Sequence, residues 1–462
     1  MLDKPDAAKA GLYPRAVTPS STRLSFGRFL SEFSQNPLRT HPAATYHEPI
    51  VLSPLRATSG KAIFLMDPAL IEEVLLDRAE EFHRSELEDR LFRHFLGRGL
   101  LTSEGQLWRW QRRTMAPLFR ASEMANYVPA MARAADEQIA RWRNAGGGWR
   151  AIDRDMSETT FIVIARTMLS GSELEETAAI RQATEDFLSG VIWEGAFGLL
   201  NFPRWLPHPK TLKMRRAGRK LRNIVAALID RGAKTGLERN DLLGHLLAAR
   251  DPETGDAMTQ ALVIDNLVTF LTAGHETTAK ALTWTLYLLA RSHEWQEALR
   301  SEVHDVAGTG EIEANHLPRL KLTQQVLKEA LRLFPPAPVL SRVFIKKGQI
   351  GGIPVEPRDM LFIPIFTVHR HNLLWDDPTK FDPTRFTADR ERAYPRAQYM
   401  PFGAGPRICI GSSFAMTEAT AILASFVRAA RFEWDGKTEP EPVSGVTLKP
   451  RNGMRLHVSM VT

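Results

Sequence analysis

The sequence predicts a mainly α-helical fold with a minor β part, and three observations lead to this prediction. Residues 259–291 carry apolar side chains at helical spacing and contain no proline, which predicts one helix longer than average. Residues 339–366 include VLSRVFI and LFIPIF, whose branched and aromatic residues are typical of short strands. Hydrophobic residues make up 44% of the 462 residues, which is enough for a sizeable core. Because no linker divides the chain, we expect a single domain over residues 1–462.

The N-terminal half is expected to be mostly helical. We expect about residues 1–50 to form a loop-rich segment and residues 68–78 to form a short amphipathic helix. Residues 103–119 predict a helix that ends near Pro117, since proline lacks the N–H group that a helix interior requires. Further on, LLNFPRWLPHPK (199–210) contains three prolines, which predicts a mobile loop. This loop separates two stretches with helical patterns, which fill much of residues 121–190 and 211–250.

The C-terminal half combines two long helices with short strands. The helix over residues 259–291 would span about 45 Å, enough to cross a whole domain. A second helix, LTQQVLKEALRLF (322–334), ends at two prolines. The segment WDDPTKFDPTRF (375–386) is typical of irregular chain punctuated by prolines. A helix resumes after Cys409, and the C-terminal residues return to strands and turns.

Charge and composition exclude several classes of protein. The formal charge is +7, and its basic residues are scattered, so the excess indicates a patch for an acidic partner or no site at all. No nucleic-acid-binding signature is present, and we expect no nucleic acid partner. One cysteine excludes an internal disulfide framework and fits a reducing, cytoplasmic setting. The N-terminal residues lack the apolar core of a signal peptide, and no apolar stretch is long enough for stable membrane insertion.

The only cysteine, Cys409, lies in the glycine-rich segment FGAGPRICIG (402–411). Glycines let the backbone run close to a flat ligand, and the following helix would stabilise an anionic sulfur through its N–H groups and dipole. One thiolate alone cannot bind an iron–sulfur cluster or a structural zinc, but it can be the axial ligand of haem iron. A small buried hydrophobe and a nucleophile remain alternatives, whereas a phosphate-binding loop would need a Gly-Lys-Ser/Thr ending.

FGAGPRICIG resembles the haem-binding loop of the cytochrome P450 family. Four other segments resemble motifs of that family in the same order along the chain, from about residue 68 to the end: WRWQRR (108–113), AGHETT (273–278), EALR (329–332) and PTRF (383–386). In the last segment, Thr384 stands where the family has glutamate. The resemblance, to soluble bacterial-type members, implies the cytochrome P450 fold with a long central helix over haem b, iron protoporphyrin IX.

The resemblance also implies which residues hold the haem. Cys409 would be the metal ligand, and Phe402, Gly411 and Ala273 would contribute to the cofactor site. Haem carries two propionates, and the guanidinium fork of arginine suits a carboxylate. The remaining cofactor-binding residues would be Trp108, Arg112, Arg342 and Arg407.

Gly274, Glu276 and Thr277 are the catalytic residues that the resemblance implies. Gly274 lies three residues before Thr277 and would leave a groove for a diatomic ligand on that helix face. The Thr277 hydroxyl would donate to bound oxygen, and Glu276 would relay protons through water. The structural alternative is that Thr277 bonds the carbonyl one turn earlier while Glu276 is solvated or ion-paired. A zinc-protease motif is excluded because Ala279 stands where the second histidine would be.

Two further sets of charged residues have expected roles. Glu329 and Arg332 share a helix face and, with Arg385, resemble the buried ion-pair network that anchors the segment positioning the cysteine loop. Arg109 and Arg113 form a stripe that we expect to face outwards as a docking patch for an acidic redox protein. The alternative for this stripe is a solvated charged face.

The resemblance implies an oxygen-activating monooxygenase that hydroxylates a hydrophobic small molecule. It would use O2 and two electrons from NAD(P)H, delivered by a ferredoxin or flavodoxin with its reductase, and we expect a monomer. A peroxide-driven peroxygenase of the same fold and a haem-thiolate sensor remain alternatives. The expected substrate pocket is mostly apolar and comprises parts of residues 91–101 and 187–197 together with Phe270, Leu271, Val339, Leu340, Val446 and Thr447.

Overall fold

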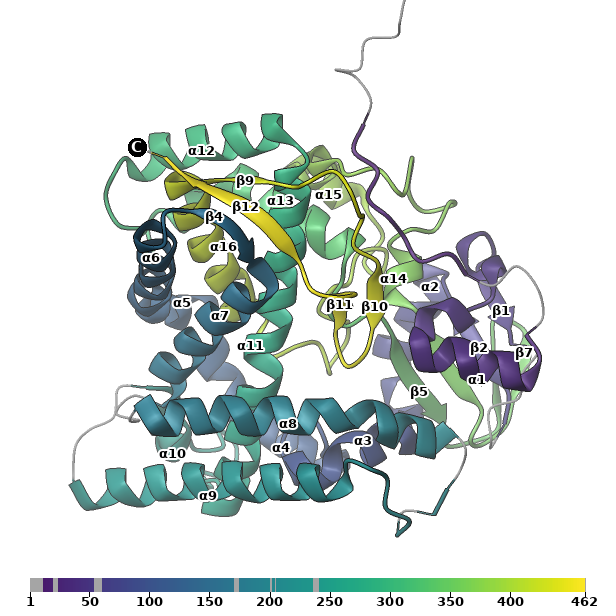
Figure 1. The fold of residues 1–462 in the computed structure, drawn as a ribbon. Coiled ribbons are helices and arrows are strands. Elements are labelled where there is room, and N and C mark those ends of the chain that lie inside the picture. The colour runs from purple at the N-terminus through teal and green to yellow at the C-terminus, as the bar shows by residue number, and fades with distance from the viewer. Residues whose placement is uncertain are drawn as a thin grey trace, which may run out of the picture.

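The main sheet and most of the long helices occupy different parts of the molecule. The structure, a computed structural model, describes residues 11–19, 24–53, 60–169, 174–199, 202–203, 205–235 and 241–461. Strands β1 (Ile50–Leu52) and β2 (Ala62–Leu65) lie at one side with helix α1 (Phe26–Gln35), and most of the long helices lie elsewhere (Figure 1). The fold is therefore mainly helical with a minor β part, as the sequence predicts.

Helix α11 (Gln260–Ala290) runs through the centre of the molecule and confirms the long helix expected over residues 259–291 (Figure 1). The Thr259 hydroxyl caps its first turn by accepting the N–H of Leu262 at 3.4 Å. Its C-terminal half is buried on every side, as is typical of an apolar helix inside a core. The helices packed against it include α7 (Ile152–Met168), α9 (Thr211–Thr235), α13 (Lys321–Leu333) and α16 (Ser412–Ala429).

The other helices surround this central group. The helix expected over residues 103–119 is α4 (Gly105–Met115), and a 3-10 turn over Ala116–Phe119 follows it because Pro117 cannot continue the α-helix. A pair of long helices, α8 (Leu174–Leu199) and α9 (Thr211–Thr235), packs side by side at the lower edge of Figure 1. The remaining helices are α2 (Pro68–Glu72), α3 (Glu86–Leu96), α5 (Ala121–Met124), α6 (Val128–Asn144), α10 (Leu242–Ala248), α12 (His293–Ala307), α14 (Ile365–Val368) and α15 (Ala388–Ala393).

The main sheet has five strands in the order β1-β2-β8-β5-β3. Its other strands are β3 (Phe82–His83), β5 (Leu340–Phe344) and β8 (Met360–Ile363). Strand β8 pairs parallel to β2 and antiparallel to β5, so that Leu361 lies beside both Ile63 and Arg342. Buried apolar residues of this sheet form a core of their own, next to the larger helical core.

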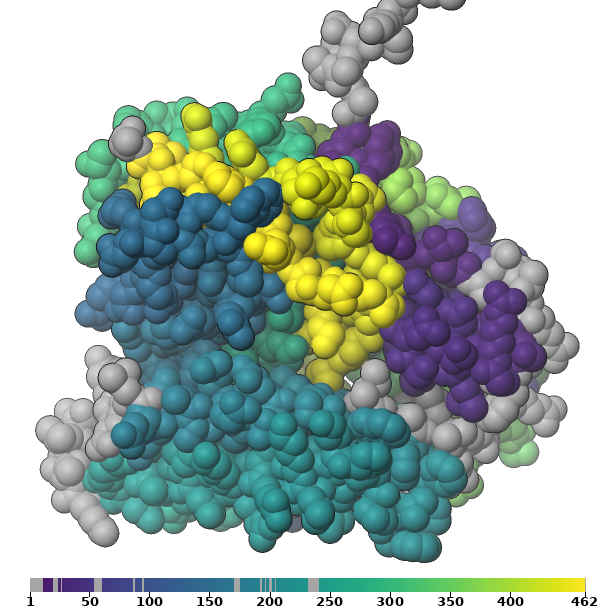
Figure 2. Space-filling view, viewed as in Figure 1, coloured from purple at the N-terminus to yellow at the C-terminus, as the bar shows by residue number. Residues whose placement is uncertain are grey.

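The C-terminal residues form smaller sheets that join distant parts of the chain. Strand β12 (Arg455–Met460) pairs antiparallel with β4 (Gly148–Ala151) and β9 (Ala430–Glu433). Strands β10 (Pro442–Ser444) and β11 (Leu448–Pro450) form a hairpin, and β6 (Gly348–Ile350) pairs with β7 (Ile353–Val355). In Figure 2 the yellow C-terminal segment fills the space between the purple N-terminal segment and the blue helices.

Several expected elements differ from the observed ones. The segment expected to be loop-rich contains α1 and two 3-10 turns, Pro37–Thr40 and Ala43–Tyr46. Strand β2 was not expected, because all four of its residues are buried and periodicity cannot distinguish such a short apolar run from a helix. The mobile loop expected over residues 199–210 lies in part outside the described residues.

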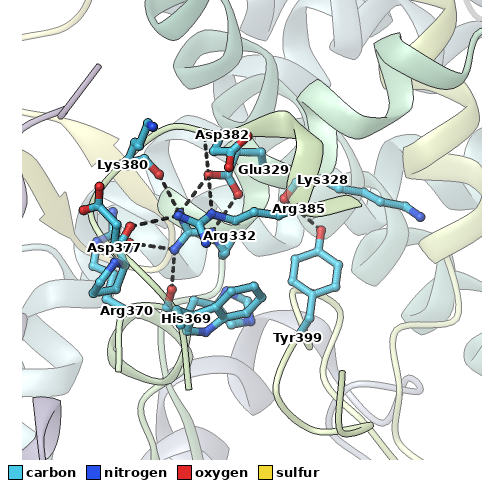
Figure 3. A network of polar contacts seen from close by, with 12 residues as sticks. Lys328, Glu329, Arg332, His369, Arg370, Asp377, Lys380, Asp382, Arg385 and Tyr399 are labelled. Atoms are coloured by element: carbon cyan, nitrogen blue, oxygen red, sulfur yellow. Dashed lines mark hydrogen bonds and ion pairs between the residues drawn. The ribbon is translucent and has the colours of Figure 1, made fainter. Parts of the chain in front are cut away.

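A fully buried guanidinium holds the irregular chain that follows the sheet. Arg332 donates to both carboxylate oxygens of Glu329, at 2.7 and 2.8 Å (Figure 3). Its other N–H groups donate to the carbonyl oxygens of His369 and Pro378, both at 2.7 Å, and of Lys380 at 2.9 Å. All five donors are therefore used, which offsets the cost of burying the charge.

The other members of this network complete the attachment. Glu329 also accepts the backbone N–H of Asp382 at 2.8 Å and lies 3.6 Å from Arg385 Nε. Arg385 donates to the Asp377 carbonyl at 2.9 Å. The structure thus brings Glu329, Arg332 and Arg385 together in the protein interior, and their contacts define the path of residues 377–385.

His369 carries this attachment on towards the cysteine loop. Its Nε2 accepts the backbone N–H of Met400 at 3.0 Å, two residues before Phe402. Burial, together with the neighbouring charges of Arg332 and Arg370, lowers the pKa of His369 to about 3, so the ring is neutral and acts as an acceptor. The loop that carries Cys409 is therefore anchored to the Arg332 network through a neutral histidine.

We expect Glu329→Ala to lower the free energy of unfolding by about 3–5 kcal/mol, because it leaves the Arg332 guanidinium buried without a counter-charge. Chemical denaturation followed by circular dichroism measures the loss. The control is a half-exposed ion pair that joins the neighbouring residue Lys328 to Glu391, with Nζ 2.6 Å from Oε1. Glu391→Ala should cost at most about 1 kcal/mol, and equal losses in the two variants would contradict the role of the network.

The stability of the protein should decrease as the pH falls below about 6.5. The pKa of His369 is about 3 in the folded protein and about 6.5 when the chain is unfolded, so the unfolded state binds more protons in this interval. The contribution of His369 to stability is therefore fully present above pH 6.5. Below that pH, protonation of His369 in the unfolded state lowers the free energy of unfolding by up to about 1.4 kcal/mol per pH unit. His369→Gln keeps an acceptor for Met400 and should show a shallower pH dependence of unfolding. An unchanged slope would contradict the assignment.

Candidate active site

The cysteine loop and the central helix line one cavity of about 400 Å³. Residues of α4, β5 and α16 also contribute to its lining, so the cavity lies where the two parts of the fold meet. Most of the lining is apolar, and the polar groups are few. A cavity of this kind is typical of a cofactor or small-molecule site.

The backbone of the cysteine loop is held by its own hydrogen bonds. The N–H of Cys409 donates to the Phe402 carbonyl at 2.9 Å, and the N–H of Ile408 donates to the Gly405 carbonyl at 3.0 Å. Gly405 has a φ of 72°, and a Cβ atom there would lie 1.8 Å from the Leu75 carbonyl oxygen. Only glycine fits at this position, which explains the glycine-rich sequence of the loop.

The thiol of Cys409 is accessible to the cavity, unlike that of a cysteine packed in a core. It is nevertheless enclosed by protein, and this burial raises the pKa of the thiol. The backbone N–H of Gly411 and the charge of Arg112 act in the opposite direction. Helix α16 begins just beyond, with Gly411 as its N-cap, so Cys409 lies before the first turn as expected. A bound cation would complete the stabilisation of a thiolate here.

The four residues expected to hold propionates all line this cavity. Trp108 and Arg112 come from α4, Arg342 from β5 and Arg407 from the cysteine loop. Burial lowers the pKa of each guanidinium, and that of Arg407 falls to about 10. Such a group of enclosed cations favours an anionic ligand.

These guanidiniums differ in the partners they already have. Arg407 stacks on the Trp108 ring at 4.4 Å and forms an ion pair with Glu104, a contact that sequence analysis did not anticipate. Arg342 donates to the Ser341 carbonyl at 2.7 Å. The side chain of Arg112 has neither a hydrogen bond nor an ion pair among the described residues, so it is the arginine best placed to receive a carboxylate.

Sequence analysis missed a second charged pair at the cavity, Arg84 and Glu88. Arg84 donates to Glu88 at 2.8 Å, and Glu88 also accepts the Ser341 hydroxyl at 2.5 Å. In the sequence, these residues are an oppositely charged pair four positions apart. Such a pair is ordinarily found on a solvated helix face, so it did not indicate a cavity. The pair adds no net charge to the cavity, and the Glu88 carboxylate partly compensates the charge of Arg342 as well as that of Arg84.

One face of α11 forms the wall that carries the AGHETT segment. Ala273, Gly274 and Thr277 line the cavity, as expected for residues three and four positions apart. A Cβ atom at Gly274 would lie 2.9 Å from Ile164 Cδ1, so glycine here also permits close packing of α7. The Thr277 hydroxyl donates to the Ala273 carbonyl at 2.9 Å, which is the structural alternative considered above, although the residue still lines the cavity.

Glu276 does not lie among the described residues that line the cavity. Its Oε1 accepts the hydroxyl of Thr447 at 2.9 Å, and the side chain is half-buried. Adjacent residues of a helix point about 100° apart, and here Glu276 turns towards Thr447 while Thr277 faces the cavity. The structure therefore corrects the expectation that the acid and the alcohol lie together at the site.

The expected substrate pocket is only partly brought together. Phe270, Leu340 and, from residues 91–101, Leu100 and Leu101 line the cavity. Leu271 does not, because it is fully buried on another side of α11, in the helical core. The other expected residues that lie outside the described lining are Val339, Val446 and Thr447. Sequence analysis missed the apolar residues Phe119, Ile164 and Met168, which are indistinguishable from ordinary core residues in the sequence.

The expected docking stripe is already paired within the chain. Arg113 binds Asp251 through two hydrogen bonds of 2.6 Å and lies 2.5 Å from Glu253. The Arg113 guanidinium lowers the pKa of the buried Asp251 carboxyl to about 2. Arg109 forms an ion pair with Glu80. Arg113 is therefore a structural cation rather than a free charge on the surface.

The residues of the cavity fit a haem group. Cys409 offers an accessible sulfur for iron, Arg112 and its neighbours offer cations for propionates, and the apolar lining suits a porphyrin ring. Among the described residues, no group of three or more His, Cys, Asp or Glu side chains could hold a metal ion in another way. The fold and the site together are those of a haem-binding protein, with Cys409 as the candidate iron ligand.

The chain belongs to the cytochrome P450 family and is an oxidoreductase of the monooxygenase class. The family model described as Cytochrome P450 matches residues 35–456. Cyclooctatin synthase of Streptomyces melanosporofaciens is 33% identical over 397 residues, 84% of this chain and 83% of the relative. Pentalenene oxygenase of Streptomyces avermitilis is 31% identical over 434 residues, 93% of this chain and 94% of the relative.

Other comparisons agree with this family. Cyclooctat-9-en-7-ol 5-monooxygenase of Streptomyces melanosporofaciens is 31% identical over 422 residues, covering 89% of both chains. The crystal structure of a cytochrome P450DA mutant heme domain superimposes with a TM-score of 0.79 at 25% identity, covering 90% of both chains. In the part of the chain that the structure describes, no helix combines the length and apolarity that a membrane crossing requires.

Proposed function

We propose that this protein hydroxylates a hydrophobic small molecule, using haem b, O2 and two electrons that originate from NAD(P)H. The observation that carries the proposal is the shared cavity, in which the Cys409 sulfur and the Thr277 face of α11 line the same space. A sensor or a peroxide-driven enzyme would not need a hydroxyl at that wall, so Thr277 supports the oxygen-activating reaction.

Different residues of the cavity would hold the haem and assist the activation of oxygen. Cys409 would hold the iron through its sulfur, and Arg112 and Arg342 would hold the propionates. When bound, haem supplies the iron at which oxygen is reduced and activated. Thr277 would hold a proton at its hydroxyl beside the α11 groove at Gly274, and the apolar side chains would exclude bulk water.

The apolar lining supports a hydrophobic substrate. Leu100, Phe119, Phe270 and Leu340 come from separate parts of the chain and offer contact area without hydrogen bonds from their side chains. The names of two relatives specify pentalenene, an alkene by its name, and cyclooctat-9-en-7-ol, an alkenol. We infer a substrate of this general kind, mostly hydrocarbon, for this chain as well.

Electrons would come from separate proteins. We propose a ferredoxin or flavodoxin with its reductase, acting on a monomer in the cytoplasm. The formal charge of +7 supports an acidic partner, since opposite net charges accelerate association. Arg113 is already paired with Asp251, so we propose that docking depends mainly on other cations.

The absorption spectrum of the purified, dithionite-reduced protein under carbon monoxide tests the haem-thiolate assignment. We expect the strongly red-shifted Soret band for which the family is named, because a thiolate ligand donates electron density to the iron. Cys409→Ser should abolish that band. A conventional, unshifted band in the unaltered protein would mean that Cys409 is not a thiolate ligand, and no haem band after haem-supplemented expression would refute the proposal.

Thr277→Ala should retain haem but divert reducing equivalents into peroxide, because the variant lacks the hydroxyl that would hold a proton at α11. The measurement is product and peroxide formed per NAD(P)H consumed, with a substrate chosen by its spin-state shift. Thr277→Ser keeps the hydroxyl and serves as the matched control, with yields near those of the unaltered protein. Unchanged product per NAD(P)H in Thr277→Ala would rule out this role.

A further inference from the structure

The carboxyl of Glu276 is bound to a residue 171 positions away in the chain. The Thr447 hydroxyl donates to Glu276 Oε1 at 2.9 Å. Thr447 is only 5% exposed, and Glu276 is half-buried. A hydrogen bond from a hydroxyl to a carboxylate is charge-assisted, and shelter from water strengthens it. The contact therefore holds the acid in one orientation.

Thr447 lies in a hairpin that is itself held on three sides. The N–H of Leu448, the next residue, donates to the carbonyl of Pro336 at 2.9 Å. Trp284 of α11 donates its indole N–H to the Leu448 carbonyl at 3.1 Å. At the other end of the turn, the N–H of Ser444 donates to Asn36 Oδ1 at 3.2 Å. The hairpin is thus a rigid arm, and Figure 2 shows the C-terminal chain wedged between other segments.

No other described group competes with Thr447 for this carboxyl. Lys280 lies one turn further along α11 and is buried, but it is not within ion-pair distance of Glu276 among the described residues. His275, on the other side, bonds the Leu271 carbonyl at 2.9 Å through Nδ1. The orientation of the acid therefore depends on the Thr447 hydroxyl.

The cavity lies on the neighbouring face of the same helix. Thr277 lines it and Glu276 does not, although Pro336, which anchors the hairpin, does. The Glu276 side chain would have to adopt another rotamer to bring its carboxyl to the cavity, and this rotation would break the bond to Thr447.

We propose that Thr447 is a positioning residue that holds the Glu276 carboxyl out of the cavity, so that the acid reaches the cavity only when this hydrogen bond opens. Thr447 then sets how often Glu276 can serve the Thr277 wall as a proton donor. That consequence rests on the proposed function, whereas the position of the carboxyl does not. Thr447, expected from sequence to touch substrate, acts instead through the acid.

The test uses two probes that bind haem iron, imidazole and histamine. Both bind through an imidazole ring, but histamine adds an ammonium group that a carboxylate in the cavity would attract. Dissociation constants come from the Soret shift of the holoenzyme, at a pH where the ring is neutral and the amine is charged. The quantity compared between variants is the preference for histamine over imidazole.

Thr447→Val has the same shape as the natural residue but lacks the hydroxyl. We expect it to increase the preference for histamine by about tenfold, the effect of one additional charge-assisted contact. Thr447→Ala should give the same increase, because it also removes the hydroxyl. Thr447→Ser keeps the donor and should retain the original preference, which a merely structural role of the side chain would not predict.

The double variant Thr447→Val/Glu276→Gln identifies the carboxyl responsible. If Glu276 is the group released, the increased preference should disappear in this protein. An unchanged preference in both Thr447→Val and Thr447→Ala, or an increase that persists without the Glu276 carboxylate, would overturn the proposal. These binding constants require no turnover, so failure to oxidise any substrate would contradict the proposed function and leave this result unaffected.

Discussion

The buried charge of Arg332 is the constraint on which the site depends. Its guanidinium is 0% exposed, and Glu329 with three carbonyl oxygens satisfies all five of its donors, which offsets the cost of burying the charge. Those carbonyls belong to an irregular segment that has no sheet or helix to hold it. The need to neutralise one cation therefore shapes the chain that leads through His369 to the cysteine loop.

Two parts of the chain, the cysteine loop and α11, form opposite walls of the cavity, and each is anchored by its own contacts. The cysteine loop is anchored through His369 and by the close approach of Gly405 to Leu75. The opposite wall belongs to α11, which is buried between helices. Arg112 and Trp108 come from α4 and contribute one cation and one aromatic face to the cavity. A ligand that contacts both walls would join them, so binding and stability should be linked.

The sequence predicts the long elements well and the pocket poorly, for physical reasons. The bounds of α11 follow from periodicity, a capping threonine and the absence of proline, all of which are local properties. Cys409, Arg112 and Arg407 belong to recognisable motifs, and they lie at one cavity together with Arg342, as expected. Leu271, Thr447 and Arg113 were misjudged, because the orientation of a side chain or the partner of a charge depends on residues far along the chain.

The network around Arg332 has a consequence for how this protein can evolve. Three of its acceptors are main-chain oxygens, which residues of every type possess. Substitutions at these positions can therefore accumulate without removing the acceptors, provided that the backbone path is kept. Natural selection needs to preserve few side chains here to preserve the geometry. Relatives that have diverged to about one-third identity can thus retain a common architecture while their sequences drift apart.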